Sequence, residues 1–257
     1  MIEAYIKVDN NLCIGCLACL RDCPQGEFRI KDGHVFVTSK RCIKCGHCFA
    51  VCPTGAISTL KSNEVISVIE KPTRLEPAIL LDLLRQRRTI RQFDTSLVPD
   101  NVLTMILEAG RITHTGRNRQ GLIFSVLRDH RDEVETIGLQ LFRRIKSIGS
   151  PFSAYLRQKN LPDDFFFYGA PLVIVISGKH EADAIFAAAN MEYMAETFGL
   201  GVLHSGFFTI AANYSRKLRV LLKIPPKNKA LATLVLGYPN VHFYRTVSRD
   251  PLNVTYL

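Results

Sequence analysis

The stretch Cys13-Ile-Gly-Cys16-Leu-Ala-Cys19-Leu-Arg-Asp-Cys23-Pro24 decides the fold of the first part of this chain, because it occurs twice. The second copy is Cys42-Ile-Lys-Cys45-Gly-His-Cys48-Phe-Ala-Val-Cys52-Pro53. Both copies have the form C-x2-C-x2-C-x3-C-P, and together they hold all eight cysteines of the 257 residues. The cysteines therefore all belong to one short region and do not cross-link the whole chain.

This spacing predicts two [4Fe-4S] clusters, because the short x2 gaps let one loop supply three of the four thiolates that a cluster needs. In the bacterial two-cluster pattern the fourth thiolate comes from the other motif. That pattern predicts one cluster on Cys13, Cys16, Cys19 and Cys52, and a second cluster on Cys42, Cys45, Cys48 and Cys23. Structural zinc normally pairs two C-x2-C units, and disulfides are rare in a reducing cytosol, so both alternatives fit less well.

Residues 1–60 resemble a bacterial-type two-cluster ferredoxin, which implies one-electron transfer at low potential. The formal net charge of the chain is +10, which taken alone favours an anionic partner such as nucleic acid, an acidic protein or a phosphorylated ligand. Each oxidised cluster with four thiolates adds about two negative charges. We therefore expect only a moderately basic holoprotein.

The composition, 47% hydrophobic and 22% charged, is that of a packed globular protein. The longest apolar runs, 171–177 and 230–237, are far shorter than the roughly 18 residues of a membrane span. The N-terminus has neither the basic start nor the apolar stretch of a secretory signal. We expect a cytoplasmic protein without a membrane segment.

We expect three regions: a two-cluster domain over 1–60, a linker over 61–79 and a second domain over 80–257. Helical periodicity predicts helices over 79–86, 100–109 and 183–198. Short runs rich in branched residues predict strands over 122–127, 172–176 and 231–236. The second domain is therefore predicted to be mixed α+β, with a central sheet flanked by helices.

An arginine-rich stretch, Arg87-Arg88-Thr89-Ile90-Arg91, follows the first of these helices. Three guanidinium groups and a hydroxyl can hold a phosphate through charge-assisted hydrogen bonds. A solvated basic face is the alternative for a charge run of this kind. A polar loop over 113–120 lies between a predicted helix and a predicted strand, and offers amides and hydroxyls to a heteroaromatic ring.

The second domain resembles the nitroreductase family of FMN-dependent oxidoreductases. The resemblance rests on the motifs R-R-T-I-R-Q-F from 87, G-R-N-R-Q from 116, Gly169-Ala170-Pro171, Asn190-Met191, Gly199-Leu200-Gly201 and Leu236-Gly237-Tyr238-Pro239. It implies an antiparallel-type sheet, bound FMN and a homodimer with a flavin at each subunit interface. The segment 244–257 would then embrace the partner, where its alternation suits an edge strand; a monomer with full flavin content in sedimentation would contradict the dimer.

The resemblance also implies roles for particular residues. The FMN phosphate and ribityl chain are expected on Arg87, Arg88, Thr89, Arg91 and the late basic residues Arg249 and Arg245. Asn118 and Gln120 are expected to contact the rest of the cofactor. The backbone of His204, Ser205 and Gly206 is expected to run past the isoalloxazine ring. His114 and His204 are candidate proton donors because histidine titrates near neutrality, although a lone histidine is more often structural.

A ferredoxin module moves single electrons, whereas a flavin exchanges one or two, so their fusion predicts a converter between the two kinds of chemistry. We expect a donor such as a ferredoxin to deliver electrons through the clusters to FMN. The acceptor would be a small electrophile such as a nitroaromatic, a quinone or an activated alkene. Two alternatives remain: an NAD(P)H-reduced flavoprotein that exports electrons through the clusters, and a non-catalytic electron-transfer or redox-sensing subunit. Nucleic-acid binding is not expected, because the arginines lack an aromatic stacking platform.

Overall fold

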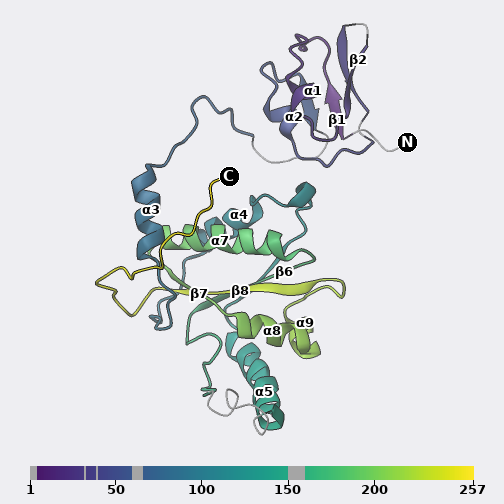
Figure 1. The fold of residues 1–257 in the computed structure, drawn as a ribbon. Coiled ribbons are helices and arrows are strands. Elements are labelled where there is room, and N and C mark those ends of the chain that lie inside the picture. The colour runs from purple at the N-terminus through teal and green to yellow at the C-terminus, as the bar shows by residue number, and fades with distance from the viewer. Residues whose placement is uncertain (1–4, 32, 39, 60–65, 150–159) are drawn as a thin grey trace. The chain divides into compact units, whose positions relative to one another are not determined.

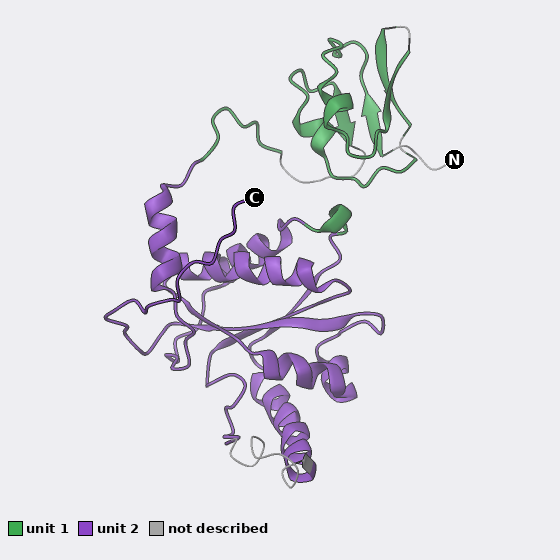
Figure 2. Cartoon of the chain, viewed as in Figure 1, with its two compact units in different colours: residues 1–73, 115–119 green, residues 74–114, 120–257 purple. Residues whose placement is uncertain are grey.

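The computed structural model describes residues 5–31, 33–38, 40–59, 66–149 and 160–257. The chain divides into two compact units, drawn in two colours in Figure 2. Unit 1 consists of residues 1–73 and 115–119, and unit 2 consists of residues 74–114 and 120–257. Positions 61–65 of the expected linker lie outside the described residues.

Unit 1 repeats one small arrangement of strand, helix and strand. The first copy contains β1 (Ile6–Val8), α1 (Ala18–Asp22) and β2 (Phe28–Lys31), and the second contains β3 (His34–Val37), α2 (His47–Ala50) and β4 (Ile57–Thr59). Strand β1 pairs with β4, and β2 pairs with β3, both antiparallel. The doubled cysteine motif therefore corresponds to a doubled fold whose outermost strands pair with each other.

Unit 2 is built on one antiparallel sheet with the strand order β5-β6-β8-β7. Its strands are β5 (Ile123–Leu127), β6 (Leu172–Gly178), β8 (Lys229–Gly237) and β7 (Gly201–His204). Figure 1 shows α3 (Pro77–Gln86), α4 (Asp100–Arg111) and α7 (Glu181–Thr197) on one side of this sheet. On the other side lie α5 (Arg131–Gly149), α8 (Gly206–Tyr214) and α9 (Arg216–Leu221). The predicted α+β fold with a helix-flanked sheet is confirmed.

Strand β6 separates two hydrophobic cores, and all seven of its residues are buried. Because successive side chains of a strand point to opposite faces, Val173 and Val175 join one core while Leu172, Ile174 and Ile176 join the other. The first core also contains Phe165, Phe166 and Phe167, and the second contains the inner face of α7. This strand is therefore the central element of unit 2.

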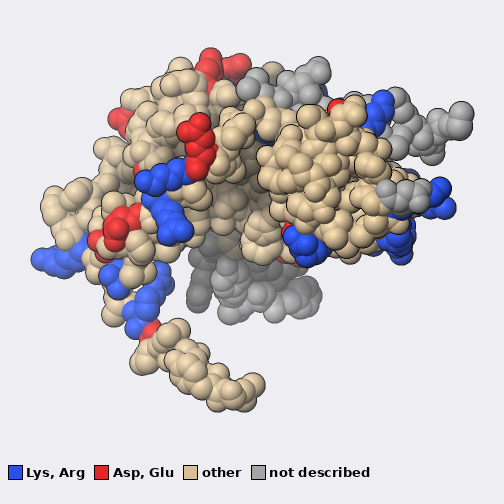
Figure 3. Space-filling model, turned by 90° about the horizontal axis from the view of Figure 1, so that it is seen from above, with Lys and Arg blue, Asp and Glu red and all other residues tan. Residues whose placement is uncertain are grey.

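The positive charge is not spread evenly over the chain. On the face drawn in Figure 3, Lys and Arg side chains lie in several separate groups with uncharged surface between them. Within the described residues, no helix has the length and apolar character needed to cross a membrane. The positive charge of this face is therefore divided among separate local groups of Lys and Arg side chains.

One carboxyl in unit 2 makes stability depend on pH. Glu135 of α5 is 5% exposed and accepts hydrogen bonds from the backbone N–H groups of Phe166 at 2.7 Å and Phe167 at 3.2 Å. Burial raises the pKa of Glu135 to about 7, with a smaller contribution from the nearby Asp164. The folded state therefore holds a proton that the unfolded state releases above pH 4.5.

We expect the stability of unit 2 to fall as the pH rises from about 4.5 to about 7, by up to about 3 kcal/mol from this group. Glu135→Gln should flatten that slope, because the amide oxygen still accepts a hydrogen bond and carries no charge. Urea unfolding at pH 5 and pH 8 measures the difference. Glu133→Gln, an exposed position on the same helix, is the matched control and should retain the wild-type slope. Equal slopes for wild type and Glu135→Gln would contradict the assignment.

Candidate functional site

The eight cysteines of unit 1 line two separate cavities, four to each. The first cavity is lined by Cys13, Cys16, Cys19 and Cys52. The second is lined by Cys23, Cys42, Cys45 and Cys48. Each cavity therefore takes three cysteines from one motif and the last cysteine of the other motif.

The doubled fold of unit 1 explains this exchange. Each motif turns through a left-handed residue directly before its helix, Leu17 with φ 61° and Gly46 with φ 76°. The third cysteine of each motif then lies inside the helix and is buried. Pairing of β1 with β4 returns the end of the second motif to the start of the first.

The two buried thiols are unfavourable sites for negative charge in the bare protein. Burial raises the pKa of Cys19, and it raises the pKa of Cys48 to about 11, with the neighbouring cysteines adding to both shifts. Iron ions in the cavity would offset this cost by pairing with the thiolates. Within the described part of the chain, no three His, Cys, Asp or Glu side chains are placed to hold a single metal ion. The cysteines instead surround cavities.

In unit 2, the arginine-rich segment lies beside the edge strand β7. Thr89 forms a parallel bridge with Val202, and the backbone N–H of Ile90 donates to the carbonyl of Val202 at 3.2 Å. Further along, Phe93 forms an antiparallel bridge with Pro239. The fold therefore holds this segment beside Val202 of β7, two residues before His204.

A buried glutamate of α7 links two of the predicted site residues. Glu192 accepts a hydrogen bond from Nη1 of Arg87 at 2.9 Å and contacts Nε2 of His204 at 3.2 Å. Burial acts to raise the pKa of Glu192, but His204 and Arg87 outweigh it and lower the pKa below its usual range. The carboxylate is therefore charged and orients both neighbours. No sequence motif predicted a role for Glu192, although a glutamate within a mostly buried helix is a signal of a charge with a specific partner.

The segment after β7 leads into the start of α8. The side chain of His204 is 46% exposed, whereas Ser205 is buried and its N–H donates to the carbonyl of Thr233 at 2.9 Å. Gly206 begins α8, and a Cβ added there would meet no atom within 4 Å. The backbone at Gly206 therefore faces open space, as a surface that receives a flat ring requires.

The remaining predicted residues lie elsewhere. Asn118 belongs to unit 1, where its side-chain amide donates to the carbonyl of Lys44 at 2.7 Å. Gln120 is exposed with φ 47°, and the ring of His114 lies 4.7 Å from that of Phe186, on α7. Two further predicted residues are exposed in the C-terminal segment, which forms no helix or strand: Arg245 and Arg249. The predicted roles of these residues at the cofactor stay predictions.

Comparison with known proteins decides the family. Residues 84–238 match the profile described as "Nitroreductase family", which covers more than half of the chain, and residues 5–53 match the "4Fe-4S dicluster domain". The chain belongs to the nitroreductase family. No curated protein sequence matches it.

Solved nitroreductases share the fold of unit 2. A nitroreductase with bound FMN from Bacteroides fragilis has 21% identity and a TM-score of 0.55, and the match covers 69% of this chain and 98% of that one. One with bound FMN from Desulfitobacterium hafniense has 21% identity and a TM-score of 0.54, over 69% and 97%. A BluB-like flavoprotein from Clostridium difficile has 16% identity and a TM-score of 0.57, over 67% and 94%.

Within this nitroreductase unit, a cavity of about 600 Å³ borders the arginine segment. Arg87 and Arg88 line it together with Glu196, Gly201 and His242. Burial and the nearby charge of Glu192 raise the pKa of Glu196. The cavity therefore combines fixed positive groups with a carboxyl that is protonated more easily than usual.

Proposed function

We propose that the protein is a cytoplasmic iron–sulfur flavin oxidoreductase that relays electrons through two [4Fe-4S] clusters and FMN to a small electrophilic substrate. One observation carries the proposal: each of two cavities is lined by four cysteines with the exchanged pairing of a two-cluster ferredoxin, in a chain that also belongs to the nitroreductase family. Nitroaromatics, quinones and activated alkenes are the substrate class.

The cysteine sets would hold one cluster each. Cys13, Cys16, Cys19 and Cys52 would bind the first cluster, and Cys42, Cys45, Cys48 and Cys23 the second. Apolar side chains accompany the cysteines in both cavities, including Val35 and Ile57 in the first and Phe28 in the second. In each cavity one cysteine is buried, Cys19 in the first and Cys48 in the second, and solvent exposure is one of the factors that set a cluster potential.

The arginine segment fits the phosphate of FMN. Arg87 has Nη1 engaged by Glu192, so its guanidinium is held in place with its other N–H groups available for hydrogen bonding. Thr89 and Arg91 follow on the same extended segment beside β7. Bound FMN would supply the exchange of one or two electrons, and the chain would bind it, orient it and hold a proton nearby.

His204 is the proton-holding group that the geometry favours. Its Nε2 contacts the charged Glu192, and nearly half of its side chain is exposed beside the backbone of Ser205 and Gly206. A carboxylate partner fixes the orientation of the imidazole. The ring of His114 contacts Phe186 and, among the described residues, no carboxylate pairs with it, so His114 is the weaker candidate.

We infer a homodimer from a surface of α3. Ile79, Leu80, Leu81 and Leu84 of this helix are each at least 40% exposed, and no residue of α3 is buried. Apolar residues gathered on one helix are typical of a surface that another chain covers. Such a dimer matches the subunit arrangement that the family resemblance implies.

The direction of electron flow is tested by reducing the oxygen-free protein with separate donors. We expect a reduced ferredoxin to bleach the flavin absorbance rapidly, followed by reoxidation on addition of a nitroaromatic or a quinone. Faster bleaching by NADH or NADPH would favour the second candidate, in which the clusters export electrons. Full reduction with no reoxidation by any small acceptor would favour an electron-transfer subunit. Absence of a flavin band at full iron content would contradict the proposal.

A further inference from the structure

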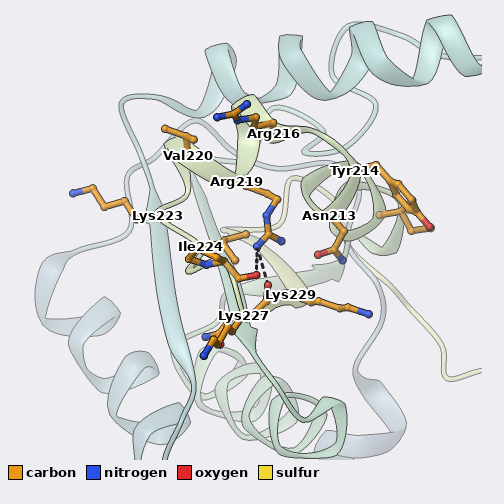
Figure 4. Close-up of a pocket in the computed structure, with 12 residues that line it drawn as sticks. Asn213, Tyr214, Arg216, Arg219, Val220, Lys223, Ile224, Lys227 and Lys229 are labelled. Carbon is orange, nitrogen blue, oxygen red and sulfur yellow. Dashed lines mark hydrogen bonds between the residues drawn. The ribbon is translucent and has the colours of Figure 1, made fainter.

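Unit 2 contains a second cavity that shares no lining residue with the one beside Arg87. Its volume is about 870 Å³. The walls come from α8, α9, the loop after α9 and the first residue of β8, as Figure 4 shows. These elements lie on the opposite side of the sheet from α3 and α7 (Figure 1), so a dimer formed through α3 would leave the cavity open.

The lining of this cavity is strongly basic. Its cations are Arg216, Arg219, Lys223, Lys227 and Lys229, and none of the described residues that line it is acidic. The sequence has no Asp or Glu at all between Glu196 and Asp250. Cations gathered without counter-charges repel one another, so the arrangement costs stability unless an anion occupies the space.

The frame that carries these cations is held by hydrogen bonds. Arg219 has a structural role, since its Nη2 donates to the carbonyls of Pro225 at 3.0 Å and Asn228 at 2.9 Å. The side chain of Asn213 makes two hydrogen bonds with the backbone of Ala230: it donates to the carbonyl at 2.8 Å and accepts from the N–H at 2.9 Å. The loop between α9 and β8 is therefore preorganised, which reduces the entropy cost of binding.

The other four cations are available to a ligand. Within the described residues, none of these cations forms an ion pair with an acidic side chain: Arg216, Lys223, Lys227 and Lys229. Figure 4 shows them around the cavity, with Lys223 and Lys229 extending to opposite sides. Lysine carries its charge on a flexible four-carbon stem, so these cations can turn toward an anion in the cavity.

An aromatic side chain completes the lining. Tyr214 at the end of α8 is 79% exposed, and Figure 4 places it at one side of the cavity, near Asn213. An exposed tyrosine beside cations offers a stacking surface for a base. The volume of about 870 Å³ lies within the range of small-molecule sites.

We propose that this cavity binds a diphosphate group, either as free pyrophosphate or as part of a nucleotide. Arg216, Lys223, Lys227 and Lys229 supply the charge, and Tyr214 supplies the contact that distinguishes a nucleotide from the inorganic ion. The proposal is independent of the flavin site. It assigns the basic stretch 216–229 a ligand that electron transfer does not require.

Calorimetric titration of the flavin-saturated, cluster-loaded protein with pyrophosphate, ADP and adenosine tests this inference. Saturation with FMN prevents the phosphates from occupying the arginine segment. We expect ADP or pyrophosphate to bind once per chain, and Lys227→Gln combined with Lys229→Gln to weaken binding at least tenfold. The matched control is Lys179→Gln combined with Lys217→Gln, which removes the same charge from exposed positions outside the lining and should change affinity less than twofold.

The variant Tyr214→Ala distinguishes a nucleotide ligand from inorganic pyrophosphate. Weaker binding of ADP with unchanged binding of pyrophosphate would support a nucleotide, and equal affinities with no effect of Tyr214→Ala would support the inorganic ion. Three outcomes would overturn the proposal: no binding of either diphosphate at millimolar concentration, equal losses in both double variants, or binding of an acidic polypeptide or DNA by a protein that binds neither diphosphate.

Discussion

Two double substitutions of cysteine should leave very different amounts of iron, although each removes two thiols. Cys13→Ala with Cys52→Ala removes two members of one cavity and should leave one cluster, about four iron atoms per chain. Cys42→Ala with Cys52→Ala removes one member from each cavity and should leave neither cluster. The measurement is iron and sulfide content after oxygen-free purification, with the spin count of the reduced protein.

The physical reason is that three thiolates do not complete a cluster that needs four, so one lost ligand is enough to remove it. If each motif held its own cluster, the two double variants would exchange results: the first would lose all iron and the second would retain about half. Flavin content is the internal control, because the nitroreductase unit has its own core and should keep its cofactor in both variants.

Replacing Gly201 with alanine should have the largest effect on the nitroreductase unit. A Cβ at Gly201 would run into Cγ1 of Ile90 and lie 2.8 Å from its Cβ and 3.1 Å from Cγ of Pro239. Ile90 is 4% exposed, so the added Cβ would push against a packed side chain. We expect a loss of about 1–3 kcal/mol in the free energy of unfolding, because overpacking a buried contact costs that much.

The same substitution should weaken FMN binding at least tenfold, since it displaces the segment that carries Arg87 and Thr89 from β7. Urea unfolding and flavin fluorescence measure the two effects. Gly206→Ala is the control for stability, because a Cβ there meets nothing within 4 Å. Adding Ile90→Ala to Gly201→Ala restores space and should recover part of both losses. Wild-type stability and FMN affinity in Gly201→Ala would contradict the close packing described here.

Periodicity and spacing predicted much of the fold because their signals are local. Helices over 100–109 and 183–198 and strands over 172–176 and 231–236 correspond to α4, α7, β6 and β8 within a few residues at each end. Helices α8 and α9 and the short strand β7 were not predicted. Strand β7 has only four residues, and its conformation depends on pairing with β8.

The sequence by itself predicted the cysteine sets, because the fixed spacing lets one loop supply three ligands and the bacterial two-cluster pattern takes the fourth from the other motif. The sequence also identified the arginine-rich segment 87–91 as a candidate phosphate-binding site. Only the tertiary structure decided that Glu192 joins Arg87, 105 positions away, to His204, and that the cations of 216–229 surround one cavity. Contacts between distant residues depend on how the sheet and its helices pack, and no short-range pattern in a single sequence records that packing.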